Sequence, residues 1–220
     1  DSVWLDVSND NGMRKTIKQK KYTIRDDYYL KGFQRNDIHL NKQGHKMRSD
    51  SILKKINGNF YLLGGQKFIG RYNPMGPNNG PGFIQEYTNS VRKFSLSDNG
   101  TTITVTHLPS HTDSTNLHRR DYNAEAQILP NGEEAITMFS GVFQQAADLP
   151  FLNSVTVDSA NYSVNNAFQQ YYNHYHCPTI PIYSESTKEM HTVFFGGIAQ
   201  YYDNAGTLVQ DNNVPFVNTI

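Results

Sequence analysis

The sequence predicts an all-β protein made of repeated units, and three observations lead to this prediction. Short runs of β-branched, aromatic and alternating apolar residues are separated by Asn-Gly, Asp-Asn-Gly and Pro-Asn-Gly turn signals. Helical periodicity is nearly absent. An apolar run followed by a pair of small residues recurs along the chain, as expected for a repeat protein.

The predicted strands follow from these runs and from the turn signals that bound them. Each is four to ten residues long and rich in residues that favour a pleated surface. They are Lys15 to Ile24, Ser51 to Ile56, Phe60 to Gly64, Val91 to Leu96, Thr101 to Leu108, Ala126 to Leu129, Ala135 to Phe139, Ser154 to Val157 and His191 to Phe195.

The first repeated feature is the pair of small residues after an apolar strand. It occurs in Phe60 to Gly65, Ile136 to Gly141 and Thr192 to Gly197. No phosphate-binding Lys-Ser/Thr pattern follows these pairs. We therefore expect a structural role, close backbone approach or a bulge, for their glycines. These are Gly64, Gly65, Gly141, Gly196 and Gly197.

Two further features recur in the same order. A polar-Ser-Val start occurs at Asn89 to Val91 and Asn153 to Val155, with Val217 to Ile220 as a looser copy and Asp1 to Val3 as another. A histidine precedes each small pair, at His45, His118 and His174. The chain therefore divides into units of about 1–88, 89–152 and 153–220.

These features resemble kelch repeats of the galactose-oxidase-like type. The resemblance implies a β-propeller with four strands per blade, although a kelch unit has about 50 residues and usually carries a Trp in its last strand. Here the units are longer and the only Trp is Trp4. Because propellers close with about four to eight blades, we expect three blade-sized repeats of a larger propeller. The alternative is a compact four-bladed closure.

Two insertions account for the length of the units. Phe68 to Tyr87 contains a Pro-, Gly- and Asn-rich stretch that no regular strand would hold, and Gln144 to Leu152 follows the second small pair. Both are predicted to be surface loops. Loops after the same strand of successive blades emerge on one face of a propeller, so this face is the predicted binding face.

The candidate ligand-binding residues combine cationic and aromatic side chains near the repeat starts. Aromatic rings stack on sugar faces, and Arg bonds hydroxyl or acidic groups. The candidates are Arg48, Arg119, Arg120, Tyr122, His174, Tyr175 and His176. Arg48 with Asp50 and Arg120 with Asp121 also fit ion pairs that recur between units.

A metal site is the alternative use of the segment from Gln169 to Pro178. His174 and His176 would point the same way in an extended strand, and His111, His118 or His191 would supply a third ligand. Copper radical oxidases of the galactose-oxidase type use His, Tyr and a Tyr-linked Cys, and Cys177 lies here. The register of the repeats instead makes His174 a framework residue like His45 and His118.

Composition excludes several classes of function. Twenty Lys and Arg balance twenty Asp and Glu, so a nucleic-acid partner is not expected. No apolar run approaches the roughly 20 residues of a membrane-spanning helix. One cysteine allows neither an intrachain disulfide nor a multi-thiolate zinc site. The abundance of Tyr, Phe, Asn, Thr and Ser is typical of a secreted or cell-surface β protein.

The sequence is thus interpreted as a non-enzymatic binding module without a cofactor, recognising a glycan or protein through loops on one face. The first alternative is a copper-dependent oxidoreductase. The second is a structural part of a larger surface assembly, whose partner would be the remaining blades or another chain.

Overall fold

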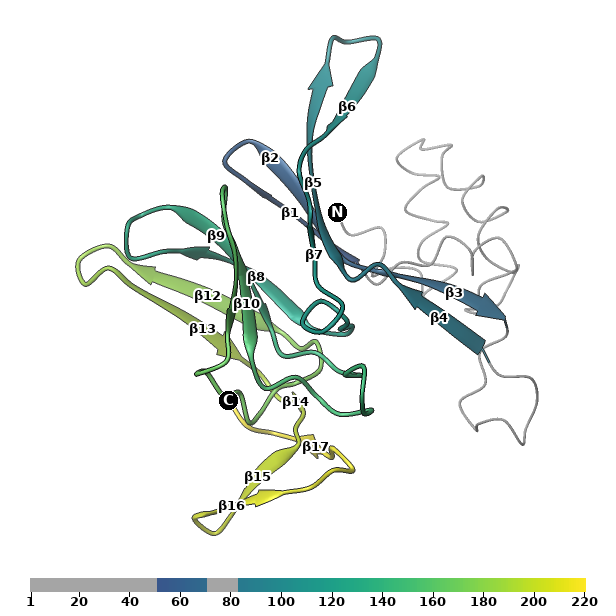
Figure 1. Cartoon of the computed structure of the whole chain (residues 1–220). Coiled ribbons are helices and arrows are strands. Elements are labelled where there is room, and N and C mark those ends of the chain that lie inside the picture. Colours follow the sequence, from purple (N-terminus) through teal and green to yellow (C-terminus); the bar gives the residue numbers. More distant parts are fainter. Residues whose placement is uncertain (1–50, 71–82) are drawn as a thin grey trace, which may run out of the picture. The chain divides into compact units, whose positions relative to one another are not determined.

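The computed structural model describes residues 51–70 and 83–220 (Figure 1). Within these ranges every regular element is a strand. The chain divides into two compact units, one formed by Asp50–Gly65 and Tyr87–Ile220 and the other by Asp1–Ser49 and Gln66–Glu86. The all-β prediction is therefore confirmed for the described residues. The predicted strand from Lys15 to Ile24 lies outside them.

The first sheet is an antiparallel meander in the larger unit. It runs in the order β1 (Ser51–Ile56), β2 (Asn59–Gly64), β5 (Ser90–Asp98) and β6 (Ile103–His107), and β7 (His111–Thr112) pairs with the start of β5. Asn57 and Gly58 turn the chain between β1 and β2 with φ values of 47° and 77°. Two positive φ values are the signature of a tight hairpin turn, as the Asn-Gly signal predicts.

The second sheet repeats this arrangement. Its order is β8 (Asn123–Ile128), β9 (Glu134–Phe139), β10 (Ser154–Val157) and β11 (Tyr162–Asn165), again antiparallel throughout. Residues 135–138 of β9 are all buried because a strand inside a sheet has neighbours on both sides and packing on both faces.

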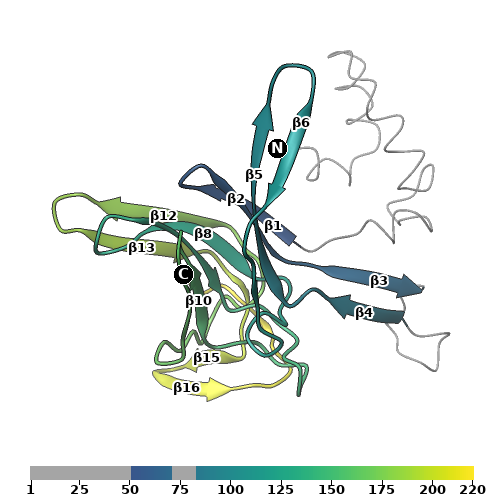
Figure 2. The ribbon, with the colours of Figure 1, turned by 45° about the horizontal axis from the view of Figure 1, so that its top comes forward.

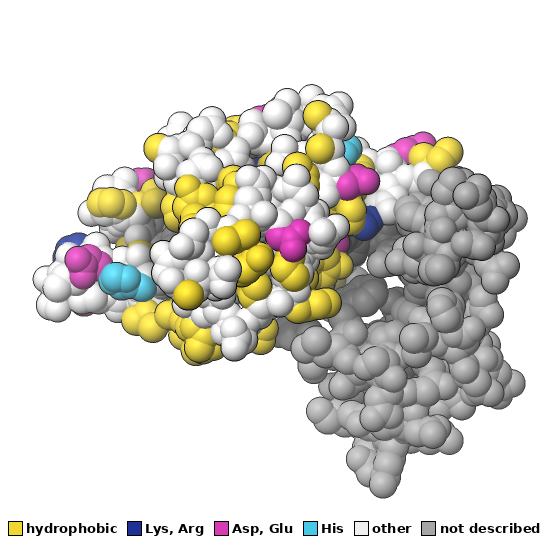
Figure 3. Space-filling model, turned by 90° about the horizontal axis from the view of Figure 1, so that it is seen from below, with side chains coloured by type: hydrophobic (Ala, Val, Ile, Leu, Met, Phe, Trp, Pro, Cys, Tyr) yellow, Lys and Arg dark blue, Asp and Glu magenta, His cyan; other side chains and the backbone are white. Residues whose placement is uncertain are grey.

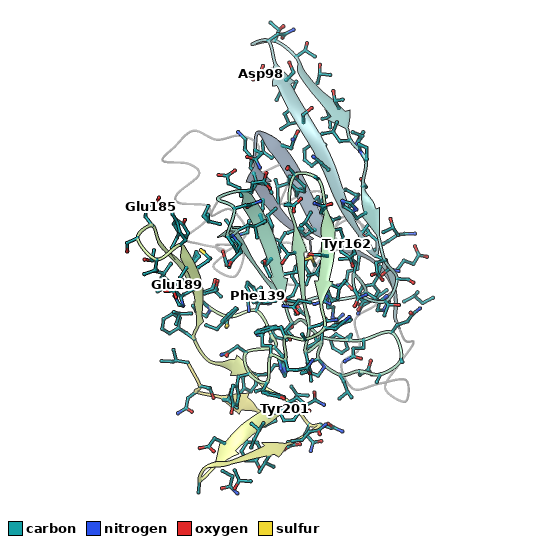
Figure 4. The ribbon with its side chains drawn as sticks, turned by 60° about the vertical axis from the view of Figure 1, so that its left-hand side comes forward. Asp98, Phe139, Tyr162, Glu185, Glu189 and Tyr201 are labelled. Atoms are coloured by element: carbon teal, nitrogen blue, oxygen red, sulfur yellow. The ribbon has the colours of Figure 1, made fainter. Side chains whose placement is uncertain are left out.

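The remaining strands form four two-stranded pairs, three of which lie wholly in the larger unit. These three are β12 (Thr179–Ser184) with β13 (Glu189–Phe194), β14 (Gly197–Ile198) with β17 (Phe216–Val217), and β15 (Tyr201–Asn204) with β16 (Thr207–Gln210). Figures 1 and 2 both show β12 beside β8. The tips of two hairpins project outward in Figure 4, where Asp98 marks the end of β5 and Glu185 the turn between β12 and β13.

The two larger sheets share one hydrophobic core. Its largest fully buried apolar side chains come from β2, β5, β9 and β10 and from the segment before β8. The cluster consists of Ile56, Tyr61, Leu63, Val91, Leu117, Tyr122, Ala124, Ile136, Met138, Val155 and Val157. Burial of these groups is the main stabilising contribution to the pairing of the sheets.

The small-residue pairs have one backbone conformation in all three copies. The first member has a φ of 58° at Gly64, 50° at Ser140 and 67° at Gly196, and the second member has 110° at Gly65, 91° at Gly141 and 100° at Gly197. Each pair lies at the end of the second strand of its sheet or hairpin: Gly64 is the last residue of β2, and the other two pairs come just after β9 and β13. Glycine adopts such positive φ values without strain, and five of the six positions are glycine, Ser140 being the exception.

The insertion predicted as a loop from Phe68 to Tyr87 contains strands, which corrects that prediction. β3 (Gln66–Gly70) and β4 (Phe83–Tyr87) form an antiparallel pair in the smaller unit. The Pro- and Gly-rich centre dominated the sequence pattern, whereas the alternating residues on either side of it pair with each other. The second insertion, Gln144 to Leu152, holds one isolated bridge from Gln144 to Ala147 and is otherwise a loop, as predicted.

The described sheets form no closed barrel or propeller. In the part of the chain that the structure describes, no helix has the length and apolar character needed to cross a membrane.

Candidate functional site

The predicted ligand-binding residues separate into buried and exposed groups. Three of them are buried: the solvent-exposed fraction is 1% for Arg119, 2% for Tyr122 and 0% for His174. Arg120 and Tyr175 are half-buried and His176 is exposed. Arg48 lies outside the described residues, as do Asp50 and His45.

Arg119 holds three segments of backbone together. Its Nε donates to the carbonyl of Asn116 at 2.6 Å, and its Nη1 donates to the carbonyl of Ser140 at 2.7 Å. Its Nη2 donates to Oδ1 of Asn153 at 2.8 Å. The guanidinium carbon lies 4.1 Å from the ring centroid of Phe151. Burial lowers the pKa of Arg119 to about 10, which leaves the side chain cationic at neutral pH.

Tyr122 explains why two of the repeat positions require glycine. Its hydroxyl donates to the carbonyl of Leu63 at 2.7 Å. A Cβ added to Gly64 would lie 2.8 Å from this hydroxyl, and one added to Gly141 would lie 2.8 Å from the Cβ of Tyr122. Both glycines thus lie close to one side chain, Tyr122, which is distant from Gly64 in the sequence and nearer to Gly141.

His174 is a neutral framework residue in this structure. Its Nε2 donates to the carbonyl of Gln170 at 2.7 Å, and its Nδ1 accepts from the backbone N–H of Gln200 at 3.1 Å. Burial lowers its pKa to about 4, against a smaller opposing effect of the hydrogen bond to Gln170. Both ring nitrogens are therefore engaged, and neither has a lone pair available for a metal.

The two histidines of the metal alternative do not share a face. The segment between Gln169 and Pro178 forms no strand, and the side chain of His176 is 64% exposed whereas His174 is buried. Among the described residues, no three His, Cys, Asp or Glu side chains group closely enough to hold a metal ion. Burial raises the pKa of Cys177, so its thiol is poorly ionised at neutral pH.

The exposed candidates gather around Asp121. Its carboxylate lies 3.2 Å from Nε of Arg120, so the ion pair expected from the sequence is confirmed in this unit. Nδ1 of His176 lies 3.8 Å from the other carboxylate oxygen, and the rings of Tyr175 and His176 lie 4.8 Å apart. Residues more than 50 positions apart in the chain thus form one charged and aromatic cluster, which we call the Asp121 cluster.

Phe143 completes the Asp121 cluster. The guanidinium carbon of Arg120 lies 4.0 Å from its ring centroid. Phe143 has a φ of 67°, a left-handed conformation that is uncommon for a bulky side chain and is found most often at turns and functional sites.

Gln144, the residue after Phe143, lines a polar pocket. The pocket has a volume of about 320 Å³ and lies among three loops of the larger unit. Five of its lining residues are carboxamides and none is ionisable. The lining consists of Thr115, Asn116, Gln144, Phe151, Leu152, Asn153, Asn166 and Gln169. On the face seen in Figure 3, uncharged side chains likewise predominate on the described surface and charged groups are scattered.

A chain of side-chain hydrogen bonds crosses the pocket wall. Nδ2 of Asn153 donates to Oδ1 of Asn116 at 3.1 Å and to Oδ1 of Asn166 at 2.9 Å. Nδ2 of Asn116 in turn donates to Asp113 at 2.8 Å. The hydroxyl of Tyr162 donates to the same carboxylate oxygen at 2.8 Å. This network ends in an anion, Asp113, and a cation, Arg119.

The pKa of Asp113 reflects the network. Burial by itself raises this pKa, but hydrogen bonds from the side chain and backbone of Asn116, from Tyr162 and from the backbone of Thr115 together outweigh burial and lower it to about 2. Burial and the bond to Asp113 raise the pKa of Tyr162 above its usual range. Both groups keep their charge states across the physiological range.

Sequence reasoning identified the loop of the pocket but not its carboxamides. Gln144 and Leu152 bound the predicted loop, and Asn153 opens the repeated polar-Ser-Val start. Asn116, Asn166 and Gln169 carry no sequence signal, because isolated Asn and Gln are common in loops of any function. No protein-family model and no curated protein matches the chain.

Proposed function

We propose that the chain is a non-enzymatic binding module made of kelch-like propeller blades. It acts outside the cell or at the cell surface and recognises a glycan or protein through loops of one face. The proposal of blades is supported by two antiparallel meanders, β1-β2-β5-β6 and β8-β9-β10-β11, because a propeller blade is a sheet of four such strands. The first sheet has β7 as an additional strand. The three small-residue pairs with one shared backbone conformation support their repetition.

The observation that carries the binding proposal is the pocket at the loop from Gln144 to Leu152. This loop was singled out by its place after the second small pair, and the pocket lies where it meets two other loops. The Asp121 cluster adjoins it through Phe143 and Gln144. A polar pocket beside a strained aromatic residue is typical of ligand-binding loops held by a rigid scaffold.

The geometry of His174 weighs against the copper oxidase alternative. Metal ligation by its Nδ1 would break the bond from Gln200, and ligation by its Nε2 would break the bond to Gln170. Each break would leave a buried backbone group unsatisfied, at a cost of about 1 to 3 kcal/mol.

A role in a larger assembly is favoured by the edge of β13. Among the described residues β13 pairs only with β12, whereas its counterpart β9 pairs with both β8 and β10. Ile180 and Ile182 of β12 are each 49% exposed. An unpaired edge beside exposed apolar residues accepts a further strand.

A binding screen of the full chain tests the proposal. Neutral, acidic and sulfated glycans would be arrayed beside extracellular protein fractions, with binding detected on immobilised chain. We expect saturable binding to one of these classes that weakens when Gln144→Ala or Arg120→Ala is introduced. Lack of binding to every class, or binding that neither substitution alters, contradicts the proposal.

A further inference from the structure

We infer that the carboxamide pocket takes an uncharged, hydroxyl-rich ligand, a neutral saccharide unit. This inference rests on the proposed binding function and assigns the ligand class of its site. The first ground is the lining, which offers five carboxamides and a threonine hydroxyl but no charged group. A carboxamide both donates and accepts, and so does a sugar hydroxyl, which makes the two chemically matched.

The second ground is that the carboxamides have fixed orientations. Arg119 has only donors, so the atom of Asn153 that it contacts must be the oxygen. The nitrogen of Asn153 then donates to the oxygens of Asn116 and Asn166. At the far end Asp113 is ionised and only accepts, which independently sets the nitrogen of Asn116 toward it. A buried cation and an anion thus set the direction of every amide between them.

The third ground is the set of groups left over by this network. Among the described residues, Nδ2 of Asn166 and Oε1 of both Gln144 and Gln169 have no hydrogen-bond partner. The pocket therefore presents one donor and two acceptors. Adjacent hydroxyls of a pyranose satisfy such a set, each donating to one group while accepting from another.

The fourth ground is the apolar part of the lining. Phe151 and Leu152 line the same pocket. Phe151 is 6% exposed and Leu152 is half-buried, so Leu152 offers most of the apolar surface on which the C–H face of a pyranose packs. Arg119 stacks on Phe151 and fixes the ring. A preformed site of this kind binds with little ordering of side chains. The pocket volume of about 320 Å³ lies at the lower end of ligand pockets and suits one or two sugar units.

An anionic ligand fits these observations less well. The cation nearest the pocket, Arg119, is buried and gives its donors to carbonyl and amide oxygens. A neutral ligand also predicts binding that hardly changes with salt, because screening acts on charge–charge attraction.

The test measures binding of free neutral mono- and disaccharides to the full chain by saturation-transfer NMR and calorimetry. Asn166→Ala and Gln169→Ala are compared with Asn204→Ala and Gln210→Ala, which change the same residue types on the β15–β16 hairpin. We expect each pocket substitution to weaken binding about tenfold, the equivalent of one lost hydrogen bond. The hairpin substitutions should leave it unchanged, and raising NaCl from about 0.05 to about 0.5 M should change it less than about twofold.

The outcomes separate this inference from the proposed function. Binding only to acidic glycans or to a protein, unaffected by Asn166→Ala and Gln169→Ala, overturns the neutral-saccharide assignment and leaves the binding function standing. Absence of binding to any glycan or protein overturns both. Circular dichroism of each variant confirms that the fold is retained, and the conservative Gln169→Asn change should recover part of the affinity if the amide itself is the ligand group.

Discussion

The second and third small-residue pairs have the same backbone but are held by different side chains. At the second pair, Arg119 donates to the carbonyls of Ser140 and Asn153. At the third, Nδ2 of Asn173 donates to the carbonyl of Gly196 and, at 3.3 Å, to that of Thr219. Both donors are buried, at 1% and 6% exposure.

The difference lies in the reach of the two side chains. The guanidinium of Arg119 extends to Asn116 and Asn153 and thereby fixes the pocket wall. The side-chain amide of Asn173 donates only to the carbonyls of Gly196 and Thr219. At both pairs a buried side chain donates to the carbonyl of the first small residue, Ser140 or Gly196. A carbonyl without a donor in such a place is costly whatever residue stands nearby. The residue that supplies the donor differs between the two pairs, Arg119 at one and Asn173 at the other. Arg119 also bonds Asn116 and Asn153 of the pocket wall.

The largest expected effect on stability comes from removing the guanidinium of Arg119, the longer of the two donors. Arg119→Met leaves the carbonyls of Ser140 and Asn116 and the amide of Asn153 without their donor, and we expect a loss of about 4 kcal/mol in the free energy of unfolding. Urea unfolding, monitored by far-UV circular dichroism, measures this loss. Lys55→Met, at an exposed position of β1, should change the stability little, and equal losses in the two variants would refute the role of Arg119.

A second comparison concerns glycines that all have a positive φ but differ in how close their neighbours lie. A Cβ at Gly141 would lie 2.8 Å from Tyr122 and 3.0 Å from the carbonyl of Arg120, whereas one at Gly197 would meet nothing closer than 3.5 Å. We expect Gly141→Ala to cost about 3 kcal/mol from strain and overpacking. Gly197→Ala and Gly132→Ala, the latter with open space around it, should each cost about 1 kcal/mol. Thermal unfolding ranks the three, and a Gly132→Ala loss as large as that of Gly141→Ala would contradict the close packing.

The third prediction concerns pH. The pKa of His174 is about 4 in the folded chain and ordinarily 6.5, so the unfolded chain binds more protons between these values. The stability that neutral His174 contributes is present above pH 6.5 and lost as pH falls toward 4. From about pH 7 to about pH 5 the loss is about 2 kcal/mol, and the lowered pKa of His118 adds to it in the same direction.

Asp113 does not produce this slope in the same window. Asp113, with a pKa of about 2, remains ionised at pH 5. Chemical unfolding at several pH values should therefore give a smaller slope for His174→Gln than for the unchanged chain. His191→Gln, whose side chain is 63% exposed, should keep the full slope, and an unchanged slope in His174→Gln would show that another group is responsible.

A smaller effect than that of Arg119→Met is expected when the shorter donor, Asn173, is removed. Asn173→Ala removes one side-chain amide from two carbonyls, and we expect a loss of about 1 to 2 kcal/mol. Equilibrium unfolding measures it beside Arg119→Met. Weakening of ligand binding should accompany Arg119→Met alone, since Asn173 contacts no residue of the pocket wall. A larger loss for Asn173→Ala than for Arg119→Met would reverse the comparison.

Much of the fold follows from local sequence signals. Strands such as Ser51–Ile56 and Ser154–Val157 have the predicted bounds because turn signals flank apolar runs. β15 and β16 were not predicted, since their residues are mostly polar and exposed and carry no alternation. β12 was missed for a similar reason, because Pro181 argues against a strand interior and is tolerated here on an edge strand.

The candidate site was predictable only in part. The repeat placed Arg120 with Asp121 and located the loop at Gln144, and the chain fold brought His176 to the same carboxylate. Whether a side chain of this kind faces inward depends on tertiary packing between segments that are distant in the sequence. Arg119 and Arg120 are adjacent and chemically identical, yet one is buried against Phe151 and the other half-exposed beside Phe143. No property of the sequence distinguishes them.

The most direct test of the account is titration of isotope-labelled chain with a neutral oligosaccharide that binds, observed through the side-chain amide signals in NMR. The account predicts that the largest shifts occur in the NH₂ groups of Asn166 and Gln169 and in the backbone of the loop from Gln144 to Leu152. Shifts confined to Arg120, Tyr175 and His176, or absent throughout at saturating ligand, would contradict it.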